Sequence, residues 1–243
     1  MLWDVDYTLV SADGLGTRLY EVVFREMFGR ELTAVAPKAG RTDRAIVGDT
    51  LALAGVSHAQ VDPFLAALAR AAADGAVPGQ VRPMAGATAA IAALASFGGP
   101  AAAGIRQSVL TGNIRPLAAL KLRRAGLGDH LDLDAGAYGD AHEVRAELVA
   151  VARRAASQAY GADFSGPATV LVGDTPLDVE AALATGARVV AVATGSYAAA
   201  DLTAAGAHVV LPDLTDAAQV LAAVAAAGPV TGPGREGAAG RAR

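Results

Sequence analysis

The sequence predicts an α/β protein, a Rossmann-like doubly wound parallel sheet with an inserted all-helical cap domain. Three observations support this prediction. Short apolar runs rich in β-branched residues alternate with helical patterns over most of the chain. Between residue 14 and about residue 80, only helical patterns occur. Carboxylates follow the ends of several predicted strands, which is where sheets of this kind bind ligands.

The predicted strands have continuous apolar runs rather than alternating ones, as is typical of parallel strands covered on both faces. They are residues 1–3, 106–110, 168–173, 188–194 and 208–212. The helical patterns that separate them are residues 85–95, 114–126, 141–159, 177–185 and 214–226. Pro116 in a first turn and Gly186 after a last turn are typical start and stop signals.

The chain divides into a core, an insertion and a tail. We expect residues 1–13 and 83–227 to form the catalytic core and residues 14–82 to form a helical cap over one end of its sheet. The two crossings between them are rich in glycine and proline, as hinges often are. Residues 228–243 have no apolar pattern and predict a disordered tail.

Composition excludes several classes of protein. The chain has 243 residues, a formal net charge of −4 and no long basic run, which argues against a nucleic-acid or anionic membrane surface. It has no cysteine, so disulfides and thiolate metal sites are excluded. No apolar run reaches the roughly 18 residues of a membrane span. We expect a soluble, cytoplasmic monomer or homodimer.

Chemically active side chains follow three of the predicted strands, and a lysine lies on a helix nearby. They are Asp4 and Asp6 after the first strand, Thr111, Gly112 and Asn113 after the second, Asp174 and Asp178 after the third, and Lys121. Taken singly, each has an ordinary structural explanation, such as an exposed strand, a helix cap or a solvated helix face. However, only Lys38 and Lys121 are lysines among 20 basic residues. The joint pattern at strand ends favours one functional site.

These motifs resemble those of the haloacid dehalogenase-like (HAD) superfamily. The matching segments are "DVDYTL", "LTGN", the lysine at 121 and "VGDTPLD". The helical insertion after the first motif resembles the phosphoglycolate-phosphatase-like branch. The resemblance covers about residues 1 to 225, and it implies a phosphatase acting on a small phosphorylated metabolite.

The resemblance also implies roles in the chemistry. Asp4 would be the nucleophile that forms an aspartyl-phosphate, and Asp6 would be the general acid and base. Thr111, Gly112 and Asn113 would bind the phosphate oxygens.

Charge neutralisation is the second part of what the resemblance implies. Lys121 would neutralise charge on Asp4 and on the phosphoryl group. Mg²⁺ would be bound by Asp4, the backbone carbonyl of Asp6 and Asp174, with Asp178 a ligand directly or through water. Oxygen ligands with phosphate are typical of this ion.

Two features depart from the usual pattern. Tyr7 stands where the superfamily usually has glycine, so the turn after Asp6 must accept a bulky side chain. Only three residues precede Asp4, fewer than the 5–6 or so of an average strand. We therefore expect either a start further upstream or an unusually short first strand.

Other activities stay open at this stage. A phosphosugar mutase would keep all four motifs. A haloacid dehalogenase needs neither a metal nor a second acid, and Asp6, Asp174 and Asp178 together argue against it. A phospho-acceptor receiver domain has a different order of acids and no helical insertion. The cap largely sets the substrate, and Arg41, Thr42 and Arg44 are candidate contacts, with Arg41 proposed to bind the non-reacting end. The alternative is that these arginines are ordinary surface charges at the start of a helix.

Overall fold

The structure is a computed structural model that describes residues 1–75, 77–97 and 104–227. The tail predicted at 228–243 lies outside these residues. A five-stranded parallel sheet lies at the centre, with strand order β4-β1-β5-β6-β7. Its strands are β1 (Leu2–Trp3), β4 (Ser108–Val109), β5 (Val170–Gly173), β6 (Arg188–Val192) and β7 (Val209–Leu211). The predicted doubly wound sheet is confirmed.

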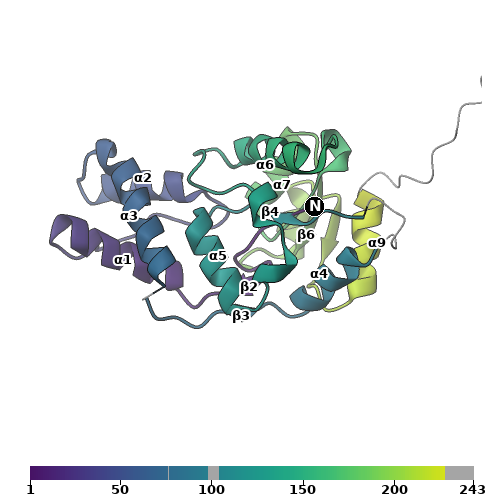
Figure 1. The fold of residues 1–243 in the computed structure, drawn as a ribbon, viewed down its shortest axis with the longest axis horizontal. Helices are drawn as coiled ribbons and strands as arrows, with labels where there is room; N and C mark the ends of the chain where they lie inside the picture. The colour runs from purple at the N-terminus through teal and green to yellow at the C-terminus, as the bar shows by residue number, and fades with distance from the viewer. Residues whose placement is uncertain (76, 98–103, 228–243) are drawn as a thin grey trace, which may run out of the picture.

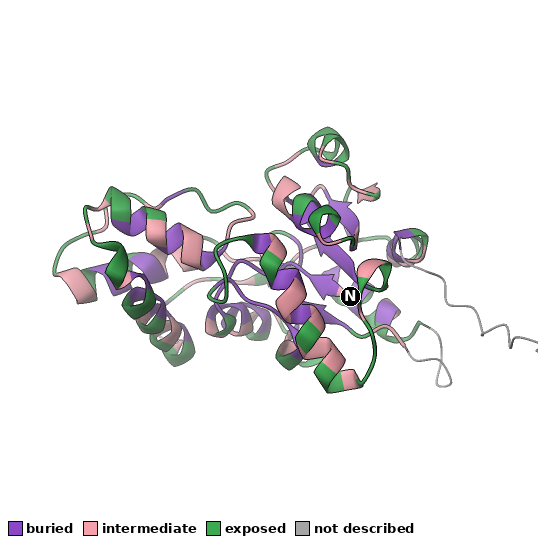
Figure 2. Cartoon of the chain, turned by 90° about the horizontal axis from the view of Figure 1, so that it is seen from above, coloured by how far each residue is buried: buried purple, intermediate pink, exposed green. Residues whose placement is uncertain are grey.

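Helices cover both faces of this sheet, because its strands are apolar on both sides. In β5, Val170 and Val172 face one hydrophobic cluster and Leu171 faces another. The first cluster includes residues of α4 (Ala87–Ala95), α5 (Arg115–Arg124) and α9 (Ala217–Ala227). The second includes residues of α6 (Arg145–Tyr160), α7 (Pro176–Ala184) and α8 (Ala199–Ala204). Figure 2 shows the buried sheet between half-buried helices.

The elements between residues 15 and 74 are all helical, as expected, although Arg82, at the end of the expected cap, belongs to a strand. It contains α1 (Leu15–Phe28), α2 (Asp43–Leu53), the 3₁₀ turn η1 (His58–Gln60) and α3 (Val61–Asp74). These helices lie together at one end of the molecule, away from the sheet (Figure 1). They have a hydrophobic core of their own, in which Tyr20 and Phe64 meet edge to face with ring centroids 5.7 Å apart. Ile114, Leu117 and Leu120 at α5 extend this core toward the sheet. We call α1 to α3 the cap.

A small two-stranded ribbon joins the crossings. Strand β2 (Val10–Ser11) pairs antiparallel with β3 (Arg82–Pro83). The sequence did not predict this ribbon or α8, because two-residue strands and a six-residue helix leave almost no periodic signal. Three further 3₁₀ turns complete the elements, at Gly128–His130, Leu133–Ala135 and Gly166–Ala168. Among the described residues, no helix combines the length and hydrophobicity needed to cross a membrane.

Candidate active site

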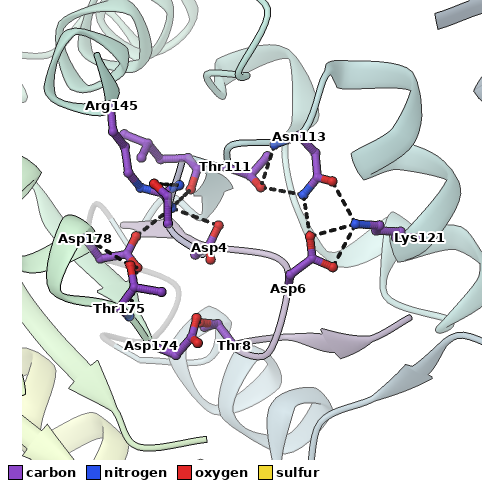
Figure 3. A network of polar contacts seen from close by, with 12 residues as sticks. Asp4, Asp6, Thr8, Thr111, Asn113, Lys121, Arg145, Asp174, Thr175 and Asp178 are labelled. Atoms are coloured by element: carbon purple, nitrogen blue, oxygen red, sulfur yellow. Dashed lines mark hydrogen bonds and ion pairs between the residues drawn. The ribbon is translucent and has the colours of Figure 1, made fainter. Parts of the chain in front are cut away.

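Three loops at the carboxyl edge of the sheet bring the predicted residues together. They follow β1, β4 and β5, which are neighbours in the sheet. Figure 3 shows their side chains converging, with Lys121 entering from α5 and Arg145 from α6. A cavity of about 280 Å³ opens here, and residues of both core and cap line it. The convergence is as the strand-end argument predicted.

Asp4 lines this cavity and is bound by a residue that the sequence did not predict. Arg145, the first residue of α6, places Nη2 2.9 Å from Asp4 Oδ1 and 2.5 Å from Asp178 Oδ1. Its Nη1 donates to the carbonyl of Gly40 in the cap at 3.1 Å. Burial raises the pKa of Asp4 to about 6, against the attraction of Arg145 and with repulsion from Asp178 and Asp6. The Asp4 carboxylate is therefore held among both like and unlike charges.

The position of Arg145 becomes unusual only with the observed start of α6, because the helix predicted over residues 141–159 would place Arg145 in its second turn. A cation in the first turn of a helix faces the positive end of the helix dipole, which is unfavourable without a compensating anion. Arg145 is nevertheless buried there, with both carboxylates as its compensation.

Three buried carboxylates form a candidate metal centre. Asp4, Asp174 and Asp178 each offer an oxygen, and these oxygens lie within 4.8 Å of one another. Burial, with repulsion from Asp4 and Asp178, raises the pKa of Asp174 to about 8. When ionised, the three carboxylates carry three negative charges, and Arg145 balances only one of them. An all-oxygen donor set with this excess charge fits a hard divalent cation such as Mg²⁺.

Asp178 has a second function at the start of α7. Its Oδ2 accepts hydrogen bonds from the backbone N–H and hydroxyl of Thr175, at 3.1 and 2.6 Å, which completes a capping box. Its Oδ1 is bound to Arg145. A carboxylate has about four lone-pair sites, so these partners are compatible with both modes expected from the sequence, direct metal contact and contact through water.

Asp6 occupies a different environment from Asp4. Lys121 Nζ donates to both of its carboxylate oxygens, at 2.7 and 2.6 Å, and Asn113 Nδ2 donates to Oδ2 at 2.8 Å. Burial alone would raise the pKa of Asp6, but the charge and hydrogen bonds of Lys121, helped by Asn113, lower it below its ordinary value. The expectation that Lys121 neutralises Asp4 is not what the structure shows. In this structure Arg145 binds Asp4, and Lys121 binds Asp6.

The predicted phosphate-binding residues lie between these two acids. Thr111 is fully buried, and its hydroxyl accepts a hydrogen bond from Asn113 Nδ2 at 2.9 Å. Gly112 lies against the cap, with its carbonyl accepting from the Asp43 N–H at 2.6 Å. A Cβ at Gly112 would lie 1.9 Å from the carbonyl oxygen of Arg41, so only glycine fits this contact. The loop after β4 thus serves both the site and the docking of the cap.

Tyr7 and Arg41 both line the cavity. Tyr7 has φ of 57°, the left-handed conformation that glycine adopts easily, so the turn keeps the usual backbone with an unusual side chain. Its side chain is exposed.

Arg41, the predicted substrate contact, is already engaged within the protein. Its guanidinium donates to the Asp49 carboxylate at 2.6 Å and to the Pro37 carbonyl at 3.1 Å.

Comparison with known families agrees with this geometry. The model of the haloacid dehalogenase-like hydrolases matches residues 1–183. The match covers more than half of the chain and includes the loops after β1, β4 and β5. The protein therefore belongs to the haloacid dehalogenase-like hydrolase family and is an enzyme of that hydrolase class. A search of curated proteins finds no match.

Solved structures of low sequence identity share the fold. A predicted phosphatase from Clostridium acetobutylicum has a TM-score of 0.62 at 15% identity, covering 91% of this chain and 97% of that one. CbbY from Rhodobacter sphaeroides, in complex with phosphate, has a TM-score of 0.61 at 20% identity, covering 88% and 94%. A candidate β-phosphoglucomutase from Bacteroides vulgatus has a TM-score of 0.62 at 16% identity, covering 93% and 88%. At these identities the likeness establishes the fold.

Proposed function

We propose that the protein is a Mg²⁺-dependent phosphatase that hydrolyses a small phosphomonoester through an aspartyl-phosphate on Asp4. The observation that carries this proposal is the contrast between two nearby acids. Asp4 lies among carboxylates and a guanidinium, while Asp6, two residues on, is held by Lys121 and Asn113. Two carboxyl groups in such different environments suit two different roles.

In the first half-reaction, an Asp4 oxygen attacks phosphorus and the bond from phosphorus to the substrate oxygen breaks. Asp6 gives its proton to that leaving oxygen. In the second, Asp6 removes a proton from water, whose oxygen attacks the phosphorus of the aspartyl-phosphate. Inorganic phosphate leaves, and the Asp4 carboxylate is restored.

The lowered pKa of Asp6 bears on this cycle. Lys121 and Asn113 keep Asp6 ionised in the free protein, which suits the base role in the second step. A bound phosphate brings negative charge close to Asp6, and a neighbouring like charge raises the affinity of a carboxylate for a proton. Substrate binding thus favours the protonated form that the first step needs.

The metal would be held by Asp4, Asp174 and the Asp6 carbonyl, with Asp178 a ligand directly or through water. When bound, it supplies positive charge opposite the charge that develops on the phosphoryl oxygens. We also propose that Thr111, Gly112 and Asn113 hold these oxygens. The cytoplasmic location and the monomeric or dimeric state expected from the sequence remain part of the proposal.

Removing the metal tests the proposal directly. We expect excess EDTA to reduce hydrolysis of small phosphomonoesters by at least about 10²-fold, the scale of losing one main source of charge stabilisation, and Mg²⁺ to restore it. We also expect Mg²⁺ to raise the thermal unfolding temperature, because it binds only the folded protein. Asp174→Asn should lose this shift, whereas Asp163→Asn, at an exposed acid outside the site, should keep it. Full activity of metal-free protein would contradict the proposal.

Asp6→Asn tests the second acid. An amide cannot exchange the proton, so we expect both half-reactions to slow by about 10²–10⁴-fold, the range for general acid–base catalysis. Single-turnover kinetics should show slower formation and slower hydrolysis of the aspartyl-phosphate. The Mg²⁺-dependent rise in unfolding temperature should persist, since the Asp6 side chain is outside the carboxylate cluster. An unchanged rate in either step would remove Asp6 from that step.

A phosphosugar mutase is the second candidate, and the structural likeness to a candidate β-phosphoglucomutase favours keeping it. Such an enzyme would use the same acids but return the phosphoryl group to a sugar. Incubation with a sugar phosphate and its bisphosphate distinguishes the two. A phosphatase releases inorganic phosphate in proportion to substrate consumed, and a mutase releases an isomer.

A further inference from the structure

The cavity above Asp4 has a cap side as well as a catalytic side. Its cap side includes Leu15, Tyr20, Lys38, Arg41 and Ile46. At about 280 Å³, it lies just below the range of roughly 300–1,000 Å³ for small-molecule sites. A compact metabolite bound at the catalytic acids would therefore also meet side chains of the cap.

Four cationic side chains line this cavity, and three of them bind carboxylates within the protein. Arg145 binds Asp4 and Asp178, and Lys121 binds Asp6. Arg41 binds Asp49.

Lys38, the fourth, is different. Its ammonium donates to the hydroxyl of Thr17, and no ion pair joins it to a carboxylate of the described residues. Among the four cations that line the cavity, Lys38 is therefore the one that forms no ion pair with a carboxylate of the described residues.

The surroundings of Lys38 also show that its charge is poorly compensated. Partial burial, and then repulsion from Lys121, lower the pKa of Lys38, and attraction to Asp6, Asp43 and Glu21 only partly offsets this. Asp43 is itself engaged by the Tyr20 hydroxyl and the Ile114 N–H, both at 2.8 Å. An anion brought into the cavity would supply the counter-charge that Lys38 lacks.

We propose that Lys38 binds a second anionic group, a carboxylate or a phosphate, on the non-reacting end of the substrate. This inference rests on the proposed phosphatase function and narrows its substrate class to short phosphomonoesters with a second negative charge. An ammonium is a compact point charge with rotatable donors, so it accepts either anion. Lys38 is thus a specificity-determining residue supplied by the insertion rather than by the core.

The test compares substrates that differ in one group. 3-Phosphoglycerate and glycerol 3-phosphate differ by a carboxylate in place of a hydroxymethyl group, and fructose 1,6-bisphosphate and fructose 6-phosphate differ by a phosphate. We expect the wild type to prefer the more anionic member of at least one pair, which also identifies the anion. Lys38→Met should lower kcat/KM for that member by about 10–100-fold, the scale of a charge-assisted hydrogen bond, and leave the other member within about twofold.

Two controls keep the result specific. Lys38→Arg retains the charge and should retain most of the preference. Arg70→Met removes an exposed cation from α3, outside the cavity, and should change neither substrate. It controls for the general loss of one positive charge from the cap.

The outcomes separate this inference from the phosphatase proposal. If the wild type hydrolyses no phosphomonoester with Mg²⁺, the proposed function is wrong. If it hydrolyses both members of each pair without preference, or if Lys38→Met slows both equally, Lys38 does not bind a second anion. If Arg41→Ala rather than Lys38→Met removes the preference, the anion is bound by Arg41, and the inference about Lys38 is overturned.

Discussion

Asp4→Asn is expected to reduce turnover by on the order of 10⁶-fold, the scale of removing the nucleophile from a hydrolase that works through a covalent intermediate. An amide oxygen is a poor nucleophile, and its product with phosphorus would not be the aspartyl-phosphate. Asp6 is a poor replacement for Asp4, because Lys121 and Asn113 bind its carboxylate and lower its pKa.

The same variant should fold as well as the wild type or better. Burial and the nearby Asp178 and Asp6 raise the pKa of Asp4 to about 6, so ionised Asp4 is unfavourable despite Arg145. The amide removes this repulsion and still offers an oxygen to Arg145. Because active sites commonly give up stability for function, a stable but inactive protein is the expected result.

Intact-mass measurement after rapid quench checks the intermediate. With a slowly hydrolysed substrate, the wild type should gain the mass of one phosphoryl group and Asp4→Asn should not. Thermal unfolding of both proteins, without metal, checks the stability. Near-normal turnover or a phosphorylated variant would show that Asp4 is not the nucleophile.

Much of the fold and of this site could be predicted from sequence because both depend on local patterns. Continuous β-branched runs identify buried parallel strands, and polar residues directly after them must meet at one edge of the sheet. This pattern predicts that Asp4, Asp6, Thr111 and Asp174 lie together. The structure brings all four to the lining of the same cavity.

The pairing of charges could not be predicted in the same way. Lys121 and Arg145 have long, flexible side chains, and spacing along the chain does not determine which carboxylate each one reaches. Lys121 projects from α5 onto the Asn113 side of the site, so it binds Asp6. Arg145 is the first residue of α6, which packs on the opposite face of the sheet from α5, and it reaches Asp4 and Asp178. The packing of α5 and α6 on opposite faces of the sheet decides this assignment.

The contacts between cap and core were also beyond local patterns. Gly112 lies against the backbone of Arg41, and the Asp43 carboxylate accepts a hydrogen bond from the Ile114 N–H. In both contacts the partners are about 70 residues apart in the sequence. Such long-range backbone contacts leave no periodic signal. Only the glycine itself hinted at a close approach.

Arg145→Met is expected to destabilise the metal-free protein by about 3–5 kcal/mol, the usual cost of removing one partner from a buried ion pair. Arg145 is buried, and its loss leaves Asp4 and Asp178 without their shared cation. Arg145 Nε has no hydrogen-bond partner, so Nη1 and Nη2 make the contacts that fix this guanidinium. Chemical denaturation at neutral pH measures the loss.

The metal distinguishes this effect from ordinary loss of packing. Without Arg145, Asp4, Asp174 and Asp178 keep their mutual repulsion with no internal cation, so Mg²⁺ should stabilise the variant more than it stabilises the wild type. Arg153→Met is the matched control from the same helix. Arg153 donates to Thr169 Oγ1 and to the carbonyls of Thr185 and Gly166, and it touches no carboxylate of the cluster. Its replacement should cost about 1–3 kcal/mol and leave the Mg²⁺ response unchanged. An identical Mg²⁺ response in Arg145→Met and the wild type would mean that Arg145 does not share its carboxylates with the metal site.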